Sequence, residues 1–194
     1  GAAGIGLALM LMLLLAGLWV GVQDRVTTYD DHLGADLVVV PAGTRNLFAD
    51  PGALPAPAVD AIAQAPGVTR AAPLRTMYQI LELPHGKAAV AAVAYEPGSG
   101  LGGPWAFTDG RAPEAPDEVA IDALWAEQHD FAIGDRLPIL GHPMRVVGLT
   151  DDTALFMTPL LFTTTAGMDQ MLRATGTPGA VLVTTANPEA VAAQ

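Results

Sequence analysis

The first 22 residues, GAAGIGLALMLMLLLAGLWVGV, contain no charged side chain. As an α-helix this stretch would be roughly 33 Å long, enough to cross a hydrocarbon layer of about 30 Å. A signal peptide has a basic start, a shorter apolar core and a small-residue cleavage site. This stretch has no initiator Met, no basic residue and a longer apolar run. It therefore predicts a transmembrane helix over 1–22, with the Trp19 ring at the membrane interface.

The residues that follow the apolar stretch predict the orientation of this helix. Residues 23–36 carry four aspartates and one basic residue, Arg25. Cytoplasmic flanks of membrane helices are enriched in Lys and Arg. We therefore expect a cell-membrane protein with residues 23–194 outside the cytoplasm. The start without Met and the helix-like end, NPEAVAAQ, predict that the chain is a piece of a longer protein.

The charge balance excludes some partners. The chain has 20 acidic and 9 basic residues and a formal net charge of −11. Nucleic-acid binding and strong attraction to anionic lipid headgroups both need clustered Lys and Arg, so neither is expected. The sequence has no Cys, so an apolar core rather than disulfides must hold the domain together.

Apolar runs and turn residues after position 22 predict an α+β domain. Without residues 105–152 the expected order is strand, helix, strand, strand, strand, helix, strand, which is close to a split β-α-β arrangement. The strands are expected at 35–40, 71–83, 87–95, 159–164 and 179–185, and the helices at 54–68 and 166–174. The predicted division is a transmembrane helix (1–22), a first part of an extracytoplasmic α/β lobe (23–104), an inserted small mostly-β lobe (105–152) and the second part of the α/β lobe (153–194).

The inserted segment contains a compact module at 117–152. Apolar and polar residues alternate at its start, which predicts a half-buried strand. Asp122 is suited to cap a short helix that runs through Gln128. The turn GHP then joins two strands, RLPIL and MRVVGL. Six apolar residues are expected to share one small core: Val119, Ile121, Leu137, Ile139, Val146 and Leu149.

The chain has no complete motif for nucleotide binding, nucleophilic catalysis or metal binding. GSGLGG at 98–103 matches the dinucleotide fingerprint, but Pro104 follows where a helix must begin, so we expect a loop. Lys87 lacks the flanking residues of a P-loop, and Ser99 lacks the nucleophile-elbow spacing.

DDH at 30–32 and EQHD at 127–130 have no metal-ligand spacing and are expected to form solvated polar faces. The paired acids are adjacent in sequence, which is poor geometry for a catalytic dyad: Asp117 with Glu118, and Asp151 with Asp152. His85 and His142 are expected in turns. We predict no catalytic, cofactor-binding or metal-binding residue, and no enzyme.

Two glycines in the apolar stretch are a candidate packing site. Gly17 and Gly21 form a G-x-x-x-G pattern, which lets two membrane helices approach closely. Glycine is common in membrane helices anyway, so glycines without a packing role are the favoured alternative.

The order of these features resembles MacB-like and FtsX-like ABC transporter permeases, with the shorter DevC-like exporters most similar. An apolar helix is followed by GADLVVVPAGT and by a helix that ends IAQAPGV. The inserted segment is similar to the family pattern GR.P..PDEV followed by GD.L.L.G....VVG. The matching residues are Gly110, Arg111, Pro113, Pro116, Asp117, Glu118, Val119, Gly134, Asp135, Leu137, Ile139, Gly141, Val146, Val147 and Gly148.

The resemblance implies a non-catalytic permease subunit with four membrane helices, whose extracytoplasmic domain couples ATP hydrolysis by a separate cytoplasmic ABC ATPase to export or mechanotransmission. It also implies a homodimer and allows a partner protein in the envelope. Two alternatives stay open beside it. One is a membrane-anchored extracytoplasmic binding module without an ATPase. The other is an anchored envelope hydrolase, which the missing nucleophile–base pair disfavours. The transported substrate is left open.

Overall fold

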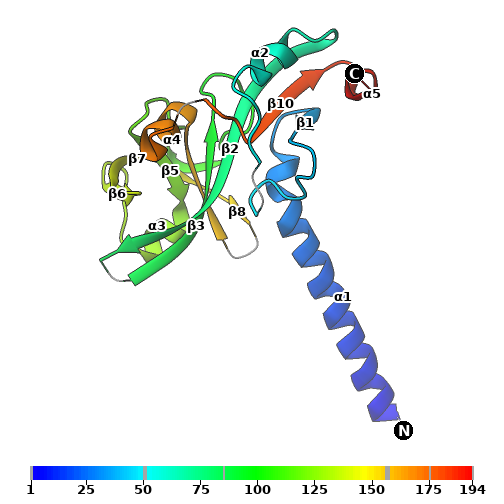
Figure 1. Cartoon of the computed structure of the whole chain (residues 1–194). Helices are drawn as coiled ribbons and strands as arrows, with labels where there is room; N and C mark the ends of the chain where they lie inside the picture. Colours follow the sequence, from blue (N-terminus) through cyan, green and yellow to red (C-terminus); the bar gives the residue numbers. More distant parts are fainter. Residues whose placement is uncertain (1, 50–51, 85, 156–157, 175, 194) are drawn as a thin grey trace.

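The protein is described by a computed structural model that covers residues 2–49, 52–84, 86–155, 158–174 and 176–193, without the side chains of residues 2, 3, 8 and 20–28. Helix α1 (Ala2–Asp31) projects from the domain as a rod (Figure 1). It continues nine residues beyond the predicted end at position 22, because residues 23–31 contain neither Gly nor Pro. Among the described side chains, no helix is both long enough and apolar enough to cross a membrane.

The rest of the chain folds around one twisted sheet, with ten strands among the described residues. The main path of this sheet runs β1-β10-β2-β3-β9-β5-β7-β4, while β6 pairs with β7 and β8 pairs with β9. The strands are β1 (Leu37–Val39), β2 (Val68–Leu83), β3 (Gly86–Tyr95), β4 (Phe107–Gly110), β5 (Glu118–Asp122), β6 (Arg136–Ile139), β7 (His142–Thr150), β8 (Ala154–Leu155), β9 (Thr158–Thr164) and β10 (Ala180–Thr185). The remaining helices are α2 (Ala58–Ala63), α3 (Ala123–Gln128), α4 (Thr165–Leu172) and α5 (Pro188–Ala192).

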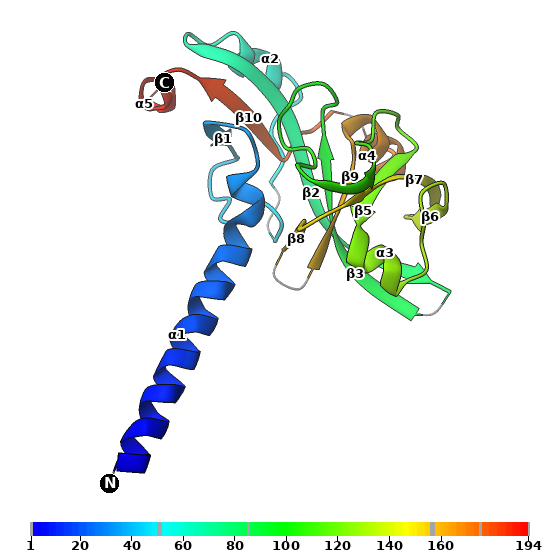
Figure 2. The ribbon, with the colours of Figure 1, turned by 180° about the vertical axis from the view of Figure 1, so that it is seen from behind.

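The α+β class is confirmed, and two split β-α-β units account for the sheet order. Strands β1 and β2, joined through α2, are parallel to one another with β10 between them, because each pairs with β10 in antiparallel fashion. Strands β9 and β10, joined through α4, are likewise parallel to one another, with β2 and β3 between them. Figure 2 shows the C-terminal α5 beyond β10, on the side where α1 joins the domain.

The segment 105–152 extends the same sheet. Strand β5 pairs with β9 on one side and with β7 on the other. All five residues of β5 are buried, so the prediction of a half-buried strand was wrong. The reason is that β5 lies inside the sheet with packed side chains on both faces. The helix cap was predicted correctly, since the Asp122 carboxylate accepts a hydrogen bond from the Trp125 N–H at 3.0 Å. The boundaries at 104/105 and 152/153 stay a prediction.

The two faces of the sheet carry two separate apolar clusters, and neighbouring residues of one strand alternate between them. The first face, here called the helix face, is covered by α3 and α4. It includes Leu81, Val90, Ala92, Val119, Ile121, Trp125, Leu137, Ile139, Val146, Leu161, Met168 and Met171, with Leu149 packed against it. The six predicted core residues are therefore confirmed as neighbours. The second face, here called the junction face, receives the end of α1 and includes Tyr29, Leu33, Phe48, Leu74, Ala91, Val93, Tyr95, Leu101, Leu160, Phe162 and Leu182.

Candidate functional site: the junction of helix α1 with the sheet

Helix α1 ends in a buried, hydrogen-bonded contact with the domain. The Tyr29 side chain is only 1% exposed, and Leu33 is 3% exposed. The Tyr29 hydroxyl donates to the Gly102 carbonyl at 3.0 Å. The Gly102 N–H in turn donates to the Leu33 carbonyl at 2.9 Å. One residue of a distant loop thus binds Tyr29 in the last turn of α1 and Leu33 just after the helix, which holds the helix end and the segment that leaves it against the domain.

Aromatic rings enclose Tyr29 inside the junction. Its ring centroid lies 5.5 Å from that of Phe48, 6.1 Å from Trp105 and 6.4 Å from Phe162. Trp105 and Phe162 make an edge-to-face pair at 6.0 Å, and His32 stacks on Trp105 at 4.5 Å. Such pairs contribute about 0.5–1.5 kcal/mol each beyond the area they bury. Burial, and then the neighbouring Asp30 charge, raises the pKa of Tyr29 well above its ordinary value. The phenol therefore stays protonated and can donate its hydrogen bond.

The glycine-rich loop at 98–103 is what lets the domain approach the helix so closely. Gly102 has φ of +68°, and a Cβ atom there would lie 2.8 Å from Leu182 Cδ1 and 2.9 Å from Leu74 Cδ1. The positive φ and the two close leucine side chains thus favour glycine at this position. Residues 98–103 form a loop as predicted, and no helix follows it before α3 in the described range 86–155. The Ser99 hydroxyl donates to the Glu96 carbonyl at 2.7 Å, as a turn serine does.

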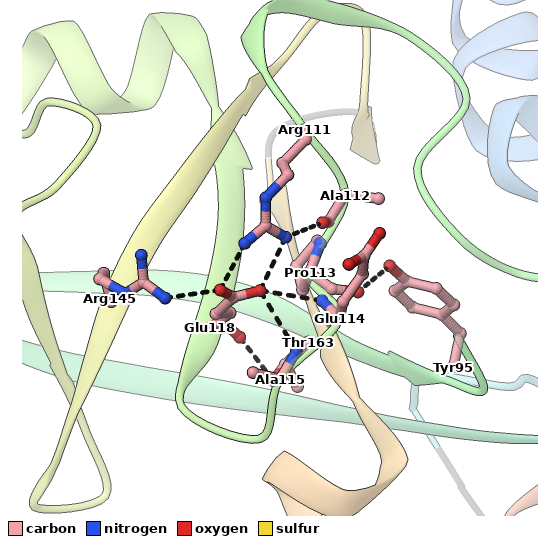
Figure 3. A network of polar contacts seen from close by, with 9 residues as sticks. All are labelled: Tyr95, Arg111, Ala112, Pro113, Glu114, Ala115, Glu118, Arg145 and Thr163. Atoms are coloured by element: carbon pink, nitrogen blue, oxygen red, sulfur yellow. Dashed lines mark hydrogen bonds and ion pairs between the residues drawn. The ribbon is translucent and has the colours of Figure 1, made fainter. Parts of the chain in front are cut away.

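A buried carboxylate, Glu118, holds the loop at 111–115, which follows β4. Glu118 is 2% exposed, and its carboxylate accepts five hydrogen bonds (Figure 3). Arg111 donates Nη1 to Oε2 at 2.8 Å and Nη2 to Oε1 at 2.5 Å. Arg145 donates Nη2 to Oε1 at 2.6 Å. The backbone N–H groups of Glu114 and Ala115 donate to Oε2 at 3.0 and 3.2 Å. These bonds tie residues 111–115 to β5 and β7.

The charge of Glu118 is strongly favoured in this setting. The Arg111 hydrogen bonds, opposed by burial and supported by the two backbone N–H groups, lower the pKa of Glu118 to about 2. The held loop presents the Pro113 carbonyl, to which the Tyr95 hydroxyl donates at 2.7 Å (Figure 3). Burial raises the pKa of Tyr95 to about 12. The acceptor sites of the Glu118 carboxylate are thus occupied by protein donors that hold this loop.

The predicted candidate residues have mixed outcomes. Gly17 has open space around it, since nothing lies within 4 Å of an added Cβ. Gly21 lies outside the described side chains, so the helix-packing site stays a prediction. His85 also lies outside the described residues. No group of three or more His, Cys, Asp or Glu among the described residues could hold a metal ion. The acids of DDH and EQHD are solvent-exposed, as expected.

Sequence inspection missed the residues that make the junction. Tyr29 and Trp105 belong to no recognisable spacing, and they meet only because α1 and the loop after β3 converge. Gly102 carried a usable signal, because a glycine cluster after a strand marks a close backbone approach as readily as a ligand. Glu118 was noticed only as one of a pair of acids, although its place in PDEV was part of the family pattern.

A family model and several curated relatives match this chain. The family model described as the MacB-like periplasmic core domain matches residues 2–194. The chain is 35% identical over 170 residues to the uncharacterized ABC transporter permeases Rv2563 of Mycobacterium tuberculosis and Mb2592 of Mycobacterium bovis. Each of these alignments covers 86% of this chain and 46% of the relative. The chain thus spans about half the length of the curated relatives it matches.

One solved structure shares the fold at low sequence identity. It is the extracellular domain of the noncanonic ABC-type transporter YknZ from Gram-positive bacteria, with a TM-score of 0.59 and 13% identity. The superposition covers 80% of this chain and 86% of that domain. At this identity the similarity concerns the fold alone.

Proposed function

The chain belongs to the family of MacB-like periplasmic core domains, and from this premise we propose that it is part of the permease subunit of an ABC transporter. In this proposal the extracytoplasmic domain couples ATP hydrolysis by a separate cytoplasmic ATPase to export or mechanotransmission. The subunit itself is non-catalytic and works as a homodimer. The relatives named above are permeases by name, which supports the class.

The surface of α1 supports the membrane anchor in this proposal. Its described large apolar side chains between Ile5 and Trp19 are 55–73% exposed, so no part of the described domain covers them. An uncharged stretch of this length matches the thickness of a hydrocarbon layer. We therefore propose that lipid covers this stretch and that residues 23–194 lie outside the cytoplasm.

This orientation has a direct test, because the chain has no Cys of its own. A single cysteine at the exposed position Glu127 is expected to react with a membrane-impermeant thiol reagent in intact cells whose outer barrier, if any, has been removed. Labelling only after lysis would overturn the orientation.

The observation that carries the coupling proposal is the fixed end of α1. A helix bound through Tyr29 in its last turn, followed by a bound Leu33 and enclosed by aromatic rings, transmits translation and rotation to the sheet instead of pivoting freely. A force applied to α1 within the membrane would then move the extracytoplasmic domain as a lever. This is the property that a permease driven by a cytoplasmic ATPase requires.

The test uses the full-length protein with its ATPase in proteoliposomes. Tyr29→Phe removes the hydroxyl that binds α1 to the loop, and Tyr95→Phe removes a comparable hydroxyl that binds the 111–115 loop. We expect both variants to retain the ATPase. Export per ATP hydrolysed should fall several-fold for Tyr29→Phe and stay near wild type for Tyr95→Phe.

Equal export by the two variants would refute the lever. Failure of the full-length protein to bind any ATPase would favour the second candidate, a membrane-anchored binding module. That candidate has its own support in a cavity at the junction, lined by Tyr29 and Phe48.

A further inference from the structure

A cavity of about 630 Å³ lies beside the end of α1 on the junction face. Its apolar lining includes Leu33, Leu47, Phe48 and Leu155, and its polar lining includes side chains from α1 and from the loop after β1. Small-molecule sites typically measure about 300–1,000 Å³ and combine an apolar lining with a few polar groups. The cavity therefore has the size and character of a site for one small amphiphilic molecule.

The outer wall of the cavity is held in place before any ligand arrives. The Asn46 side chain accepts hydrogen bonds from the backbone N–H groups of Phe48 at 2.8 Å and Ala49 at 2.9 Å. The Thr44 N–H donates to the Pro41 carbonyl at 3.1 Å. The Thr76 hydroxyl of β2 donates to the Leu47 carbonyl. A ligand would thus enter a formed site and pay little ordering entropy.

The rim of the cavity carries one side chain of each charge. Arg45 is solvent-exposed and makes no ion pair among the described residues, whereas Arg75, Arg111 and Arg145 each pair with an acid. Asp30 lies on the α1 side of the same cavity and also has no ion pair among the described residues. Asp30 is exposed overall, but partial burial of its carboxylate, and then the neighbouring Asp31 charge, raises its pKa. A positive charge beside this carboxylate would favour its ionised form and so oppose the shift.

We propose that this cavity binds a zwitterionic amphiphile with a single apolar chain. The phosphate of such a molecule pairs with Arg45, its amine pairs with Asp30, and its chain covers Leu47, Phe48 and Leu155. A purely anionic head would meet Asp30, and a purely cationic head would meet Arg45, so complementary charge selects the molecule that carries both. Tyr78 and Ile80, which are 51% and 63% exposed on the same face of β2, extend the apolar surface for a longer chain.

The position of the cavity bears on what the bound molecule does. Asp30 follows Trp19 by eleven residues, a rise of about 16 Å along the helix. A molecule in the cavity has therefore left the hydrocarbon layer if α1 is anchored as proposed above. Binding itself does not require an ATPase, while a role as exported cargo rests on the proposed function.

The test is photo-crosslinking on the full chain in nanodiscs of phosphatidylglycerol, which is an anionic host lipid. The probe is lysophosphatidylethanolamine with a diazirine in its acyl chain, and crosslinked peptides are mapped by mass spectrometry. We expect crosslinks on the loop that carries Leu47 and Phe48. Unlabelled lysophosphatidylethanolamine should compete at a concentration at least tenfold lower than lysophosphatidic acid or an alkylammonium of equal chain length.

Two substitutions should change the charge preference in opposite directions. Arg45→Gln should lower labelling at least fivefold and let the alkylammonium compete better than before. Asp30→Asn should lower labelling comparably and improve competition by lysophosphatidic acid. Arg136→Gln and Glu127→Gln, exposed residues outside the cavity, are the matched controls and should label as wild type. Melting followed by circular dichroism shows whether each variant is folded.

Three results would overturn the proposal. One is labelling in which the singly charged competitors match the zwitterion. A second is labelling unchanged by Arg45→Gln and Asp30→Asn in folded protein. The third is crosslinking confined to residues before Trp19, which indicates bilayer lipid only. Loss of ATPase coupling in the experiments of the preceding subsection leaves this binding intact, so the two proposals fail separately.

Discussion

The helix face and the junction face belong to the same strands but are covered in different ways. On the helix face, Val90 and Ala92 of β3 belong to a mostly aliphatic cluster that includes side chains of α3 and α4. On the junction face, Ala91 and Val93 of the same strand belong to a cluster that includes Tyr29 at the end of α1, other aromatic rings and Leu101 of the glycine-rich loop. The helix face is closed by elements of the domain itself. The junction face is closed by an element that projects out of the domain.

This difference separates two properties that one sheet must provide. Burial on either face contributes to the free energy of unfolding, because both clusters remove apolar surface from water. Only the junction face determines how rigidly α1 is connected to the sheet. Mutations of equal chemistry on the two faces should therefore cost similar stability and have different effects on the helix.

The largest effect is expected from a matched pair of adjacent leucines in β9. Leu160 packs on the junction face and Leu161 on the helix face, and each is 1% exposed. Leu160→Ala and Leu161→Ala should each lower the free energy of unfolding by about 2–5 kcal/mol. Hydrogen exchange of the amides at 29–33 should accelerate more in Leu160→Ala than in Leu161→Ala. Equal acceleration would show that the faces are not independent.

A somewhat smaller effect is expected at Glu118, and it depends on pH. Its pKa falls from an ordinary 4.5 to about 2 on folding. The stability it contributes is therefore present above pH 4.5 and is lost as the pH falls toward 2. The loss is up to about 3 kcal/mol. Glu118→Gln should be less stable than wild type at pH 7, and the difference in urea-unfolding free energy should shrink between pH 5 and pH 2.

Glu118→Gln should also affect the 111–115 loop and the helix face differently. Arg111 and Arg145 have side chains 48% and 45% exposed, so both can turn to water once the carboxylate charge is gone. We therefore expect Glu118→Gln to loosen the 111–115 loop without unfolding the helix face. A stability difference that stays constant with pH would mean that the Glu118 charge is not favoured by folding.

The smallest effect is expected from the single hydroxyl that binds α1. Tyr29→Phe leaves the aromatic packing in place and removes one hydrogen bond, which contributes about 0.5–1.5 kcal/mol net. Thermal melting should shift by only a few degrees. Hydrogen exchange at the end of α1 should nevertheless rise, while exchange in α4 on the helix face should not. Protection of both regions as in wild type would assign the fixing of α1 to the aromatic rings alone.

Local signals explain the part of the fold that could be predicted. Apolar runs with turn residues between them predicted the strands and helices of both split units. Hydrophobic periodicity and turn-forming residues are local features that span only a few residues. The Asp122 cap was predictable for the same reason, since the carboxylate and the N–H it accepts from are three residues apart. The short strands β4 and β8 were missed, because four and two residues carry too little pattern.

The features that could not be predicted depend on contacts between residues far apart in the sequence. The alternation in β5 predicted one buried face, but pairing with β9 and β7 buried both. The apolar stretch of α1 was evident from composition, whereas the burial of Tyr29 depends on Gly102, 73 positions away. Most helices and longer strands could be read from the sequence alone, because those preferences are local. Only the tertiary structure decided which residues hold α1 and where a cavity forms, because both depend on contacts between segments that the sequence pattern does not place together.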